Sequence, residues 1–208
     1  PVAAPSANRS TRPSPTTAAH VLEDMDGRIP LILDGGSCDF GVESTVLDAT
    51  GPVPVILRPG AVTREMIAEV AGGCQVADSV MRPLKDGEAA PSPGMRHRHY
   101  APRGRLTIYR GQAGEVARQI NQVYETETGR TVILALSSHL DAYRGKDVMD
   151  MGETQLDAAR HLFAYLREAD MRGYDRLLAE AVSEESVGLA VMNRMARAAA
   201  FDVVDVSG

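Results

Sequence analysis

Apolar and polar positions along the 208-residue chain follow a regular pattern from about residue 105 onward. Short apolar runs such as RLTIYR, TVILALS and DRLLAEAV are separated by stretches with apolar residues every three to four positions. The clearest of these stretches, 154–170, places Leu162 and Leu166 on one helical face. Strands that alternate with helices predict parallel pairing, so a layered α/β domain is expected. The expected strands are 105–110, 131–137, 146–151 and 175–182, and the expected helices are 115–125, 154–170 and 185–200.

The first 82 residues show shorter and less regular elements. Ser14 and Pro15 suit the N-cap and first turn of a helix over 14–25. A second helix is expected over 62–70, beginning near Thr63. The expected strands are IPLILDGG (29–36), ESTVLD (43–48) and PVPVILRPG (52–60).

Residues 83–104 differ in composition from both flanking parts, because prolines, arginines and histidines gather there. Prolines in that number prevent a regular helix or a central strand, so this stretch is expected to be an ordered linker. The sequence therefore predicts three parts, which are residues 1–82, the linker 83–104 and the domain 105–208.

Composition narrows the classes of function. Aromatic residues make up 4% of the chain, with no Trp, which argues against stacking platforms for single-stranded nucleic acid. A net charge of −6 argues against a broad phosphate-gripping surface, although a local basic pocket remains compatible with it. Cys38 and Cys74 form no metal-binding pattern, and no signal peptide or membrane span is evident, so a cytoplasmic protein with free thiols is expected.

The opening loop is the first candidate for chemistry. Ser6, Asn8 and Ser14 supply neutral donors and acceptors, and a helix start at Ser14 would add free backbone N–H groups. Such a loop suits an anion or a nucleotide. A capped turn explains the same residues, because Ser, Asn and Pro are ordinary turn formers.

Two strand ends are further candidates. Ser44 could stand at a strand edge beside a ligand, or Ser44 and Thr45 could simply alternate across a sheet. Arg58 ends an apolar strand before a Pro-Gly turn, where it could bind a phosphate or carboxylate, or form a surface ion pair.

The linker sequence MRHRHYAP could fold over a bound anion or simply be solvated by its charges. His97 and His99 have no carboxylate or thiolate nearby in the sequence, so a metal site is not expected. The Walker phosphate loop, the dinucleotide fingerprint and the G-x-S-x-G nucleophile elbow are absent, and Cys38 has no partner His at a suggestive spacing.

Each of these loops is a weak signal alone, but together and in this order they point to one protein family. PVAAPSANRS…SPTTAAHV, ILDGG…GVESTVLD, ILRPG and PGMRHRHYAP closely resemble the two-domain form of YrdC-type threonylcarbamoyl-AMP synthases, and VGLAVMNRMARAA resembles the end of that family's C-terminal domain. The resemblance spans nearly the whole chain. It implies part of a YrdC-like α/β domain, then the linker, then a small Rossmann-like parallel α/β domain.

The resemblance implies that L-threonine, bicarbonate and ATP, with Mg²⁺, give threonylcarbamoyl-AMP and pyrophosphate. The product serves threonylcarbamoyl modification of adenosine in transfer RNA, which involves further tRNA-modification proteins. It places Ser6, Asn8, Ser14, Arg58 and Tyr100 near ATP. It also places Ala4 and Ser44 near threonine, and it identifies no catalytic side chain.

Two departures from the family pattern matter. Thr11 stands where the family usually has Gly, which would permit a positive φ or a close ligand approach. The resemblance also implies a long segment ahead of Pro1, with the basic residues that bind the triphosphate and part of the threonine pocket, and the sequence does not contain this segment. The chain is therefore expected to be a C-terminal portion, inactive or nearly so alone, with an apolar sheet edge over residues 29–58.

Two rival functions stay open. An RNA-binding or translation-associated module would need a contiguous basic surface and would show salt-dependent RNA binding. A carbamoyl transferase with the same fold, as in hydrogenase maturation, would carry zinc-finger and acylphosphatase-like modules instead of the HRHYAP linker and the α/β tail.

Overall fold

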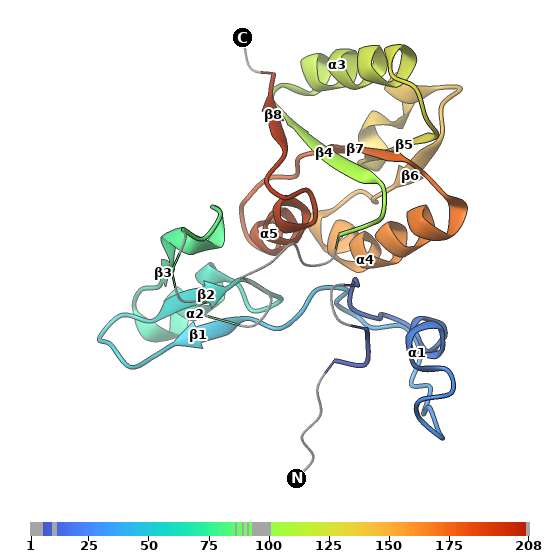
Figure 1. Ribbon diagram of the computed structural model, residues 1–208. Helices are drawn as coiled ribbons and strands as arrows, with labels where there is room; N and C mark the ends of the chain where they lie inside the picture. The colour runs from blue at the N-terminus through green and yellow to red at the C-terminus, as the bar shows by residue number, and fades with distance from the viewer. Residues whose placement is uncertain are drawn as a thin grey trace.

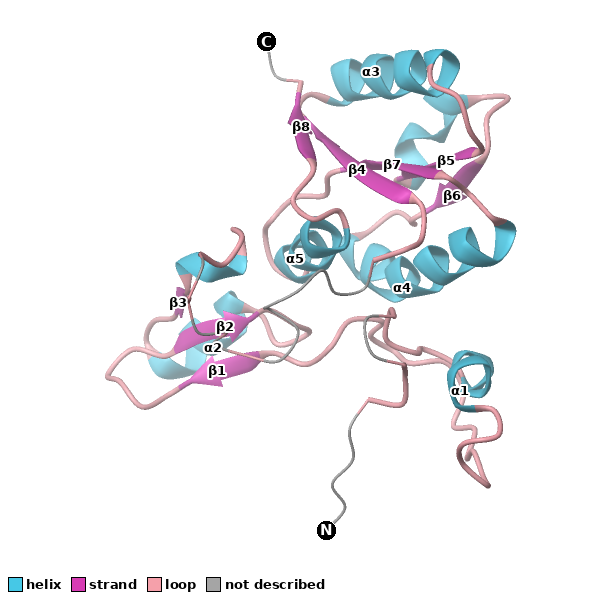
Figure 2. Cartoon of the chain, viewed as in Figure 1, coloured by secondary structure: helices cyan, strands magenta, loops and turns pink. Residues whose placement is uncertain are grey.

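A computed structural model describes residues 6–9, 12–85, 87, 88, 90, 92 and 101–206. Two sheets organise the chain (Figure 1), a three-stranded sheet in the N-terminal part and a five-stranded sheet in the C-terminal part. Figure 2 shows that the N-terminal part consists largely of loops, with only short helices and strands between them. The α/β class expected from the sequence is confirmed.

The five-stranded sheet is parallel throughout, with the strand order β6-β5-β7-β4-β8. Because β7 lies between β4 and β5, this order differs from the dinucleotide-binding fold, in which the first two strands of the sheet are neighbours. The strands are β4 (Arg105–Arg110), β5 (Thr131–Ala135), β6 (Val148–Asp150), β7 (Arg176–Glu180) and β8 (Val203–Asp205). The helices are α3 (Ala113–Thr126), η2 (Ser137–Tyr143, a 3₁₀ helix), α4 (Gln155–Arg172) and α5 (Gly188–Ala198).

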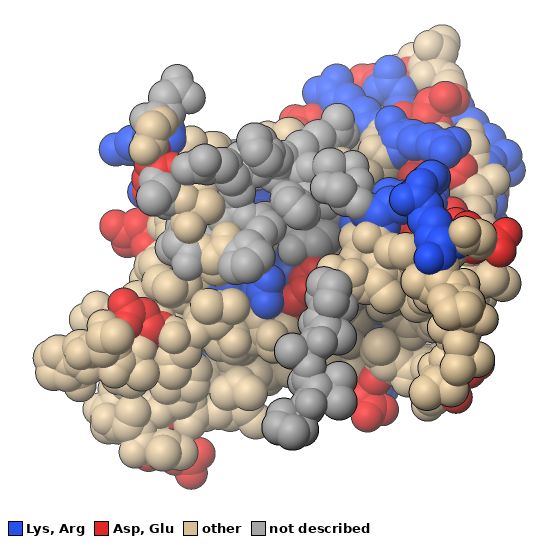
Figure 3. Space-filling view, turned by 60° about the horizontal axis from the view of Figure 1, so that its bottom comes forward, with Lys and Arg blue, Asp and Glu red and all other residues tan. Residues whose placement is uncertain are grey.

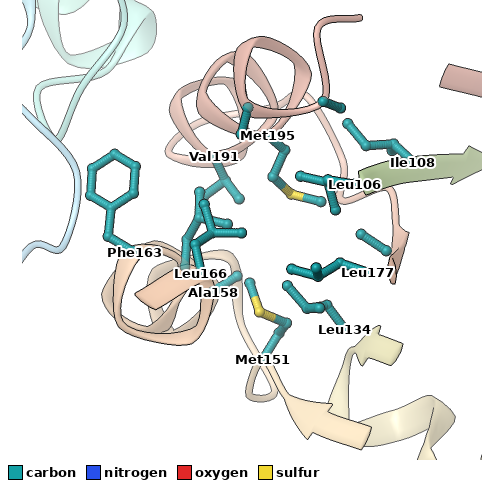
Figure 4. Close-up of a cluster of buried hydrophobic side chains, with 14 of the residues drawn as sticks. Leu106, Ile108, Leu134, Met151, Ala158, Phe163, Leu166, Leu177, Val191 and Met195 are labelled. Carbon is teal, nitrogen blue, oxygen red and sulfur yellow. The ribbon is translucent and has the colours of Figure 1, made fainter. Parts of the chain in front are cut away.

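Helices cover both faces of this sheet. Helix α3 lies on one face, while α4 and α5 lie on the other, between the sheet and the N-terminal part (Figure 1). All five residues of β5 are buried, as expected for a parallel strand that is covered on both sides. On the α4/α5 side the core gathers the buried side chains of Leu106, Leu134, Leu166 and Met195 (Figure 4).

The regular elements of this half match the sequence pattern closely. Strand β4 coincides with the predicted run 105–110, and α4 differs from its predicted range by one to two residues. Thr154 and Asp157 form a reciprocal capping box that fixes the start of α4. Strand β8 was not predicted, because a three-residue strand carries too little periodicity to stand out.

The smaller sheet has the order β1-β2-β3. Strands β1 and β2 are antiparallel, β2 and β3 are parallel, and α2 connects the parallel pair. Helix α2 starts next to Thr63, as predicted, and Thr63 caps it, because its Oγ1 accepts a hydrogen bond from the Met66 N–H. The elements are α1 (Ala18–Met25), β1 (Val46–Asp48), β2 (Val55–Arg58), α2 (Arg64–Ala71), β3 (Gln75–Val76) and η1 (Asp78–Val80, a 3₁₀ helix).

The strand expected over 29–36 is wrong for this structure. Within the described residues no strand pairs with that run, and Leu31 and Leu33 are 70% and 86% exposed. An apolar run becomes a strand only where another strand completes its backbone hydrogen bonds, so the sequence signal for burial exceeds what this structure supplies.

The helix expected over 14–25 begins later, at Ala18. Thr17 is its N-cap and accepts a hydrogen bond from the His20 N–H. Ser14 lies before the helix because its hydroxyl bonds elsewhere, to Glu43. The proposed cradle of free N–H groups at Ser14 is therefore not a helix N-terminus.

None of the helices among the described residues combines the length and the apolar character that a membrane crossing requires.

Candidate functional site

Three predicted site residues from separate parts of the sequence converge on one loop, residues 43–45. The Ser14 hydroxyl donates to Glu43 Oε1 at 2.7 Å. From the end of β2, Arg58 Nε and Nη2 both donate to the carbonyl oxygen of Ser44, at 3.2 and 3.1 Å. Ser14 and Arg58 are thus linked to neighbouring residues of the same loop, which leads into β1.

The turn after β2 holds this loop closely. A Cβ atom on Gly60 would lie 2.4 Å from the Thr45 nitrogen and 2.5 Å from the Glu43 carbonyl oxygen, so no other residue fits without displacing backbone. The Thr45 hydroxyl donates to the carbonyl oxygen of Val62 at 2.6 Å on the other side of the turn. Gly60, the glycine of ILRPG, therefore allows the turn after β2 to pack closely against the backbone of residues 43–45.

The charge state of Glu43 is set by a buried arginine. Burial alone would raise the pKa of Glu43, but the charge of Arg194 and hydrogen bonds from Ser14 and Arg194 outweigh it and lower the pKa. Arg194 Nε lies 2.7 Å from Glu43 Oε2, and its side chain is 0% exposed. Because the carboxylate is ionised, Ser14 is the donor in their hydrogen bond, and its oxygen keeps its lone pairs for other partners.

A second ionic cluster fixes the segment before Ser14. The buried carboxylate of Asp24 lies 2.6 Å from Arg12 Nη1 and 2.7 Å from Arg167 Nη2, and it accepts from the Arg9 N–H at 3.2 Å. Burial would raise the pKa of Asp24, but the hydrogen bonds from Arg167, Arg9 and Arg12 together lower it. Arg167 also donates to the carbonyl oxygen of Pro13 at 2.5 Å.

Asn8 belongs to this second cluster rather than to the loop around Ser44. Its Nδ2 donates to the carbonyl oxygens of Arg9 and Arg12, at 3.0 and 3.2 Å. Its Oδ1 is buried and has no hydrogen-bond partner among the described residues. Ser6 is exposed, and within the described part of the chain no hydrogen bond joins it to Ser14.

Two predicted site residues, Ala4 and Tyr100, lie outside the described residues, as do Thr11, His97 and His99. The linker lid and the threonine contact at Ala4 therefore stay predictions. Ser44 is exposed, and its side-chain role also stays a prediction.

Sequence reasoning missed the charged residues that organise these loops. Glu43, Asp24, Arg167 and Arg194 were not singled out. A signal was present, because Arg194 interrupts the predominantly apolar helix GLAVMNRMARA, and a fully buried Arg requires a charged or polar partner. The partner itself lies about 150 positions earlier, which no local pattern reveals.

Among the described residues no group of three or more His, Cys, Asp or Glu side chains is arranged to hold a metal ion. The polar groups that meet here are hydroxyls, carbonyl oxygens, carboxylates and guanidinium groups.

Residues 62–200 match the family described as threonylcarbamoyl-AMP synthase, C-terminal domain, and residues 1–60 match the family described as telomere recombination. The chain belongs to the threonylcarbamoyl-AMP synthase family.

Relatives in this family are similar along nearly the whole chain. Threonylcarbamoyl-AMP synthase of Pyrococcus abyssi is 42% identical over 99% of this chain and 60% of its own length. The Schizosaccharomyces pombe enzyme of that name is 40% identical over 96% of this chain and 52% of its own length. The chain therefore spans little more than half the length of these relatives.

Solved structures agree. Pyrococcus abyssi Sua5 complexed with L-threonine superimposes with a TM-score of 0.85 at 39% identity, covering 97% of this chain and 58% of that chain. A Pyrococcus abyssi Sua5 variant, with a histidine and a tyrosine changed to alanine, gives a TM-score of 0.86 at 37% identity, covering 98% and 58%.

Proposed function

We propose that this chain supplies part of the substrate site of an L-threonylcarbamoyladenylate synthase, a nucleotidyltransferase that acts in transfer RNA modification. The enzyme would join L-threonine and bicarbonate as a carbamate and transfer the adenylyl group of ATP to it, releasing pyrophosphate. The observation that carries the proposal is the convergence of Ser14, Ser44 and Arg58 on one loop in a chain of this family.

The groups present suit the positioning of a charged, hydroxyl-bearing ligand. Ser14 offers an oxygen acceptor, because its own proton points to Glu43. Arg58, at the end of β2, brings a cation next to exposed Ser44. Adenylyl transfer depends mainly on positioning and on charge stabilisation, which such groups supply.

L-threonine as substrate is supported by the Pyrococcus abyssi relative, whose structure contains it. ATP, its Mg²⁺ and bicarbonate follow from the family reaction, with Ser6, Asn8 and Tyr100 proposed on the ATP side and Ala4 on the threonine side. We place the protein in the cytoplasm, where proteins of transfer RNA modification would use its product.

Direct binding to RNA is not part of the proposal. On the face seen in Figure 3, Lys and Arg side chains are accompanied by Asp and Glu side chains rather than forming a surface of one sign. A phosphate-gripping surface would concentrate positive charge.

The chain spans little more than half the length of its relatives, so we propose that it has little or no activity by itself. The exposed apolar residues Leu31 and Leu33 are compatible with further packing partners in a longer protein.

The test is pyrophosphate release from ATP in the presence of Mg²⁺ and bicarbonate, with and without L-threonine. The 208-residue chain and a longer protein that contains it are measured together, with the Pyrococcus abyssi enzyme as positive control. Threonine-dependent release by the longer protein, lost in its Arg58→Gln variant, is the expected result. Release that does not respond to threonine would overturn the proposal.

A further inference from the structure

Three buried arginines mark the side of the C-terminal domain that faces the N-terminal part. Arg167 on α4 and Arg194 and Arg197 on α5 are only 2%, 0% and 3% exposed. In Figure 1 these two helices lie between the five-stranded sheet and the N-terminal segments. Arginine side chains are almost never buried to this degree unless their charge is paired or fully hydrogen-bonded.

The partners of these arginines lie in three separate segments of the first 80 residues. Arg167 binds Asp24 and the Pro13 carbonyl oxygen, Arg194 binds Glu43, and Arg197 Nη2 donates to the Ser79 carbonyl oxygen at 3.0 Å. One layer of helices therefore holds several segments that are far apart in the sequence, including Asp24 of α1 and Ser79 of η1.

Ser14 lies between two of these contacts. Arg167 fixes the carbonyl group of the preceding residue, Pro13, while the Ser14 side chain bonds to Glu43, which Arg194 holds. Arg194 Nη2 also approaches the Glu43 carbonyl oxygen at 3.4 Å, and its Nη1 donates to Asn193 Oδ1 at 2.6 Å. The guanidinium group is thereby oriented by three acceptors, so the direction of the Glu43 carboxylate is set.

Packing of the N-terminal segments against α4 and α5 would not by itself require these arginines. Burying a charge costs free energy, and well-packed apolar side chains of similar volume often stabilise an interface equally well or better. Directional ion pairs instead select one arrangement of the groups that they hold.

We propose that the C-terminal domain positions the substrate loops, with Arg194 acting through Glu43 on Ser14 and Arg167 acting on the segment that precedes it. The contact of Ser14 with a nucleotide rests on the proposed function, whereas the ordering of its loop does not. Arg194 and Glu43 are thus positioning residues, and Ser14 is the group that they present, as an acceptor, to a ligand donor such as a ribose hydroxyl.

Hydrogen exchange of the 208-residue chain without ligand tests the ordering. In the Arg194→Gln variant, amides in residues 12–17 and 43–46 should exchange about tenfold faster, as expected when a hydrogen bond to a charged group is lost. Arg194→Lys, which keeps the charge but loses the planar fork, should restore part of the protection.

Arg197→Gln is the matched control, because Arg197 is equally buried on the same helix but bonds to Ser79. Its effect should fall on residues 77–81 and leave residues 12–17 unchanged. Glu43→Gln breaks the same ion pair by removing the carboxylate instead of the arginine, so it should reproduce the Arg194→Gln exchange pattern. It keeps the test available if the Arg194→Gln variant folds poorly. Equal loosening of all segments in Arg194→Gln and Arg197→Gln, or none at residues 12–17 in Glu43→Gln, would overturn the proposal.

Calorimetric titration with Mg-ATP of a longer protein that contains this chain then separates the two proposals. Roughly tenfold weaker binding in Arg194→Gln and Glu43→Gln, but not in Arg197→Gln, supports positioning for the nucleotide. Faster exchange without any ATP binding in the unaltered protein would sink the proposed function and leave the loop ordering standing. Unchanged ATP affinity in both variants would overturn the role of Arg194 toward the ligand.

Discussion

Different interactions stabilise the C-terminal part and the N-terminal part of the molecule. The five-stranded sheet has apolar clusters on both faces, with Leu162, Phe163 and Leu166 of α4 fully buried. The N-terminal part has a sheet of three short strands, and it leaves Leu33 and Val70 86% and 89% exposed. The first part is therefore stabilised mainly by apolar burial, and the second depends on directional contacts with α4 and α5.

This difference determines where each kind of substitution should have its effect. Removing apolar volume should matter most within the C-terminal core, whereas removing charge should matter most where α4 and α5 meet the N-terminal loops.

The largest effect is expected from Phe163→Ala. The side chain is fully buried within the apolar cluster around α4, so its loss leaves a cavity and should lower the free energy of unfolding by about 3–5 kcal/mol. Urea unfolding followed by circular dichroism measures this. Leu33→Ala, at an 86% exposed site, is the control and should change the free energy of unfolding by less than about 0.5 kcal/mol. Similar losses from the two changes would remove the contrast between the parts.

Breaking the buried ion pair comes next. Arg167→Met leaves Asp24 buried with only Arg12 as a cationic partner, and it should cost about 3 kcal/mol in the same urea experiment. Arg144→Met is the matched control, because the Arg144–Asp141 pair is 79% and 86% exposed and should contribute nothing measurable. A stable Arg167→Met protein would show that the pair is dispensable.

Acid should weaken the contacts between the two parts. The folded pKa values of Glu43 and Asp24 lie below the ordinary values of 4.5 and 3.8, so their stabilisation is complete above those values and is lost as the pH falls through the folded pKa values. The urea concentration at the unfolding midpoint of the unaltered chain should therefore decrease as the pH is lowered below 4.5. The decrease should be steeper than in the Glu43→Gln variant. Identical pH profiles for the two proteins would contradict the assignment of Glu43 as a paired carboxylate.

The smallest effect is expected at the start of α4. Thr154→Ala removes the capping box and should cost about 1 kcal/mol, while Thr154→Ser should retain most of the stability. Helix α4 supplies both core residues and Arg167, so thermal unfolding should show a lower melting temperature with a single transition. A cost above that of Phe163→Ala would mean that capping, rather than packing, dominates this helix.

The fold of the C-terminal domain could largely be predicted from the sequence, because its elements are long and periodic. Strand β4 and helix α4 carry their signals locally, and parallel pairing follows from their alternation. The run at 29–36 misled for a physical reason: apolar residues indicate burial, but they do not provide a strand partner.

The site was predictable in part. The loops of Ser14, Ser44 and Arg58 were recognised from their order in the chain, and the structure brings them to one place. Their organisation by Glu43 and Arg194 could not be predicted, because an ion pair between residues about 150 positions apart leaves no trace in a local pattern.

The order of strands in the larger sheet has a consequence for how the protein is made. Strand β4 pairs with β7 and β8, the last two strands of this sheet in chain order, so the middle of the sheet closes only after β7 has been made. Ribosomes add about 5–20 residues per second, so Glu43 waits on the order of ten seconds for Arg194, and Asp24, which already has Arg12, waits a similar time for Arg167. Correct placement of Ser14 therefore requires that α5 has been translated, and products that stop before α5 would be left with loosely held loops.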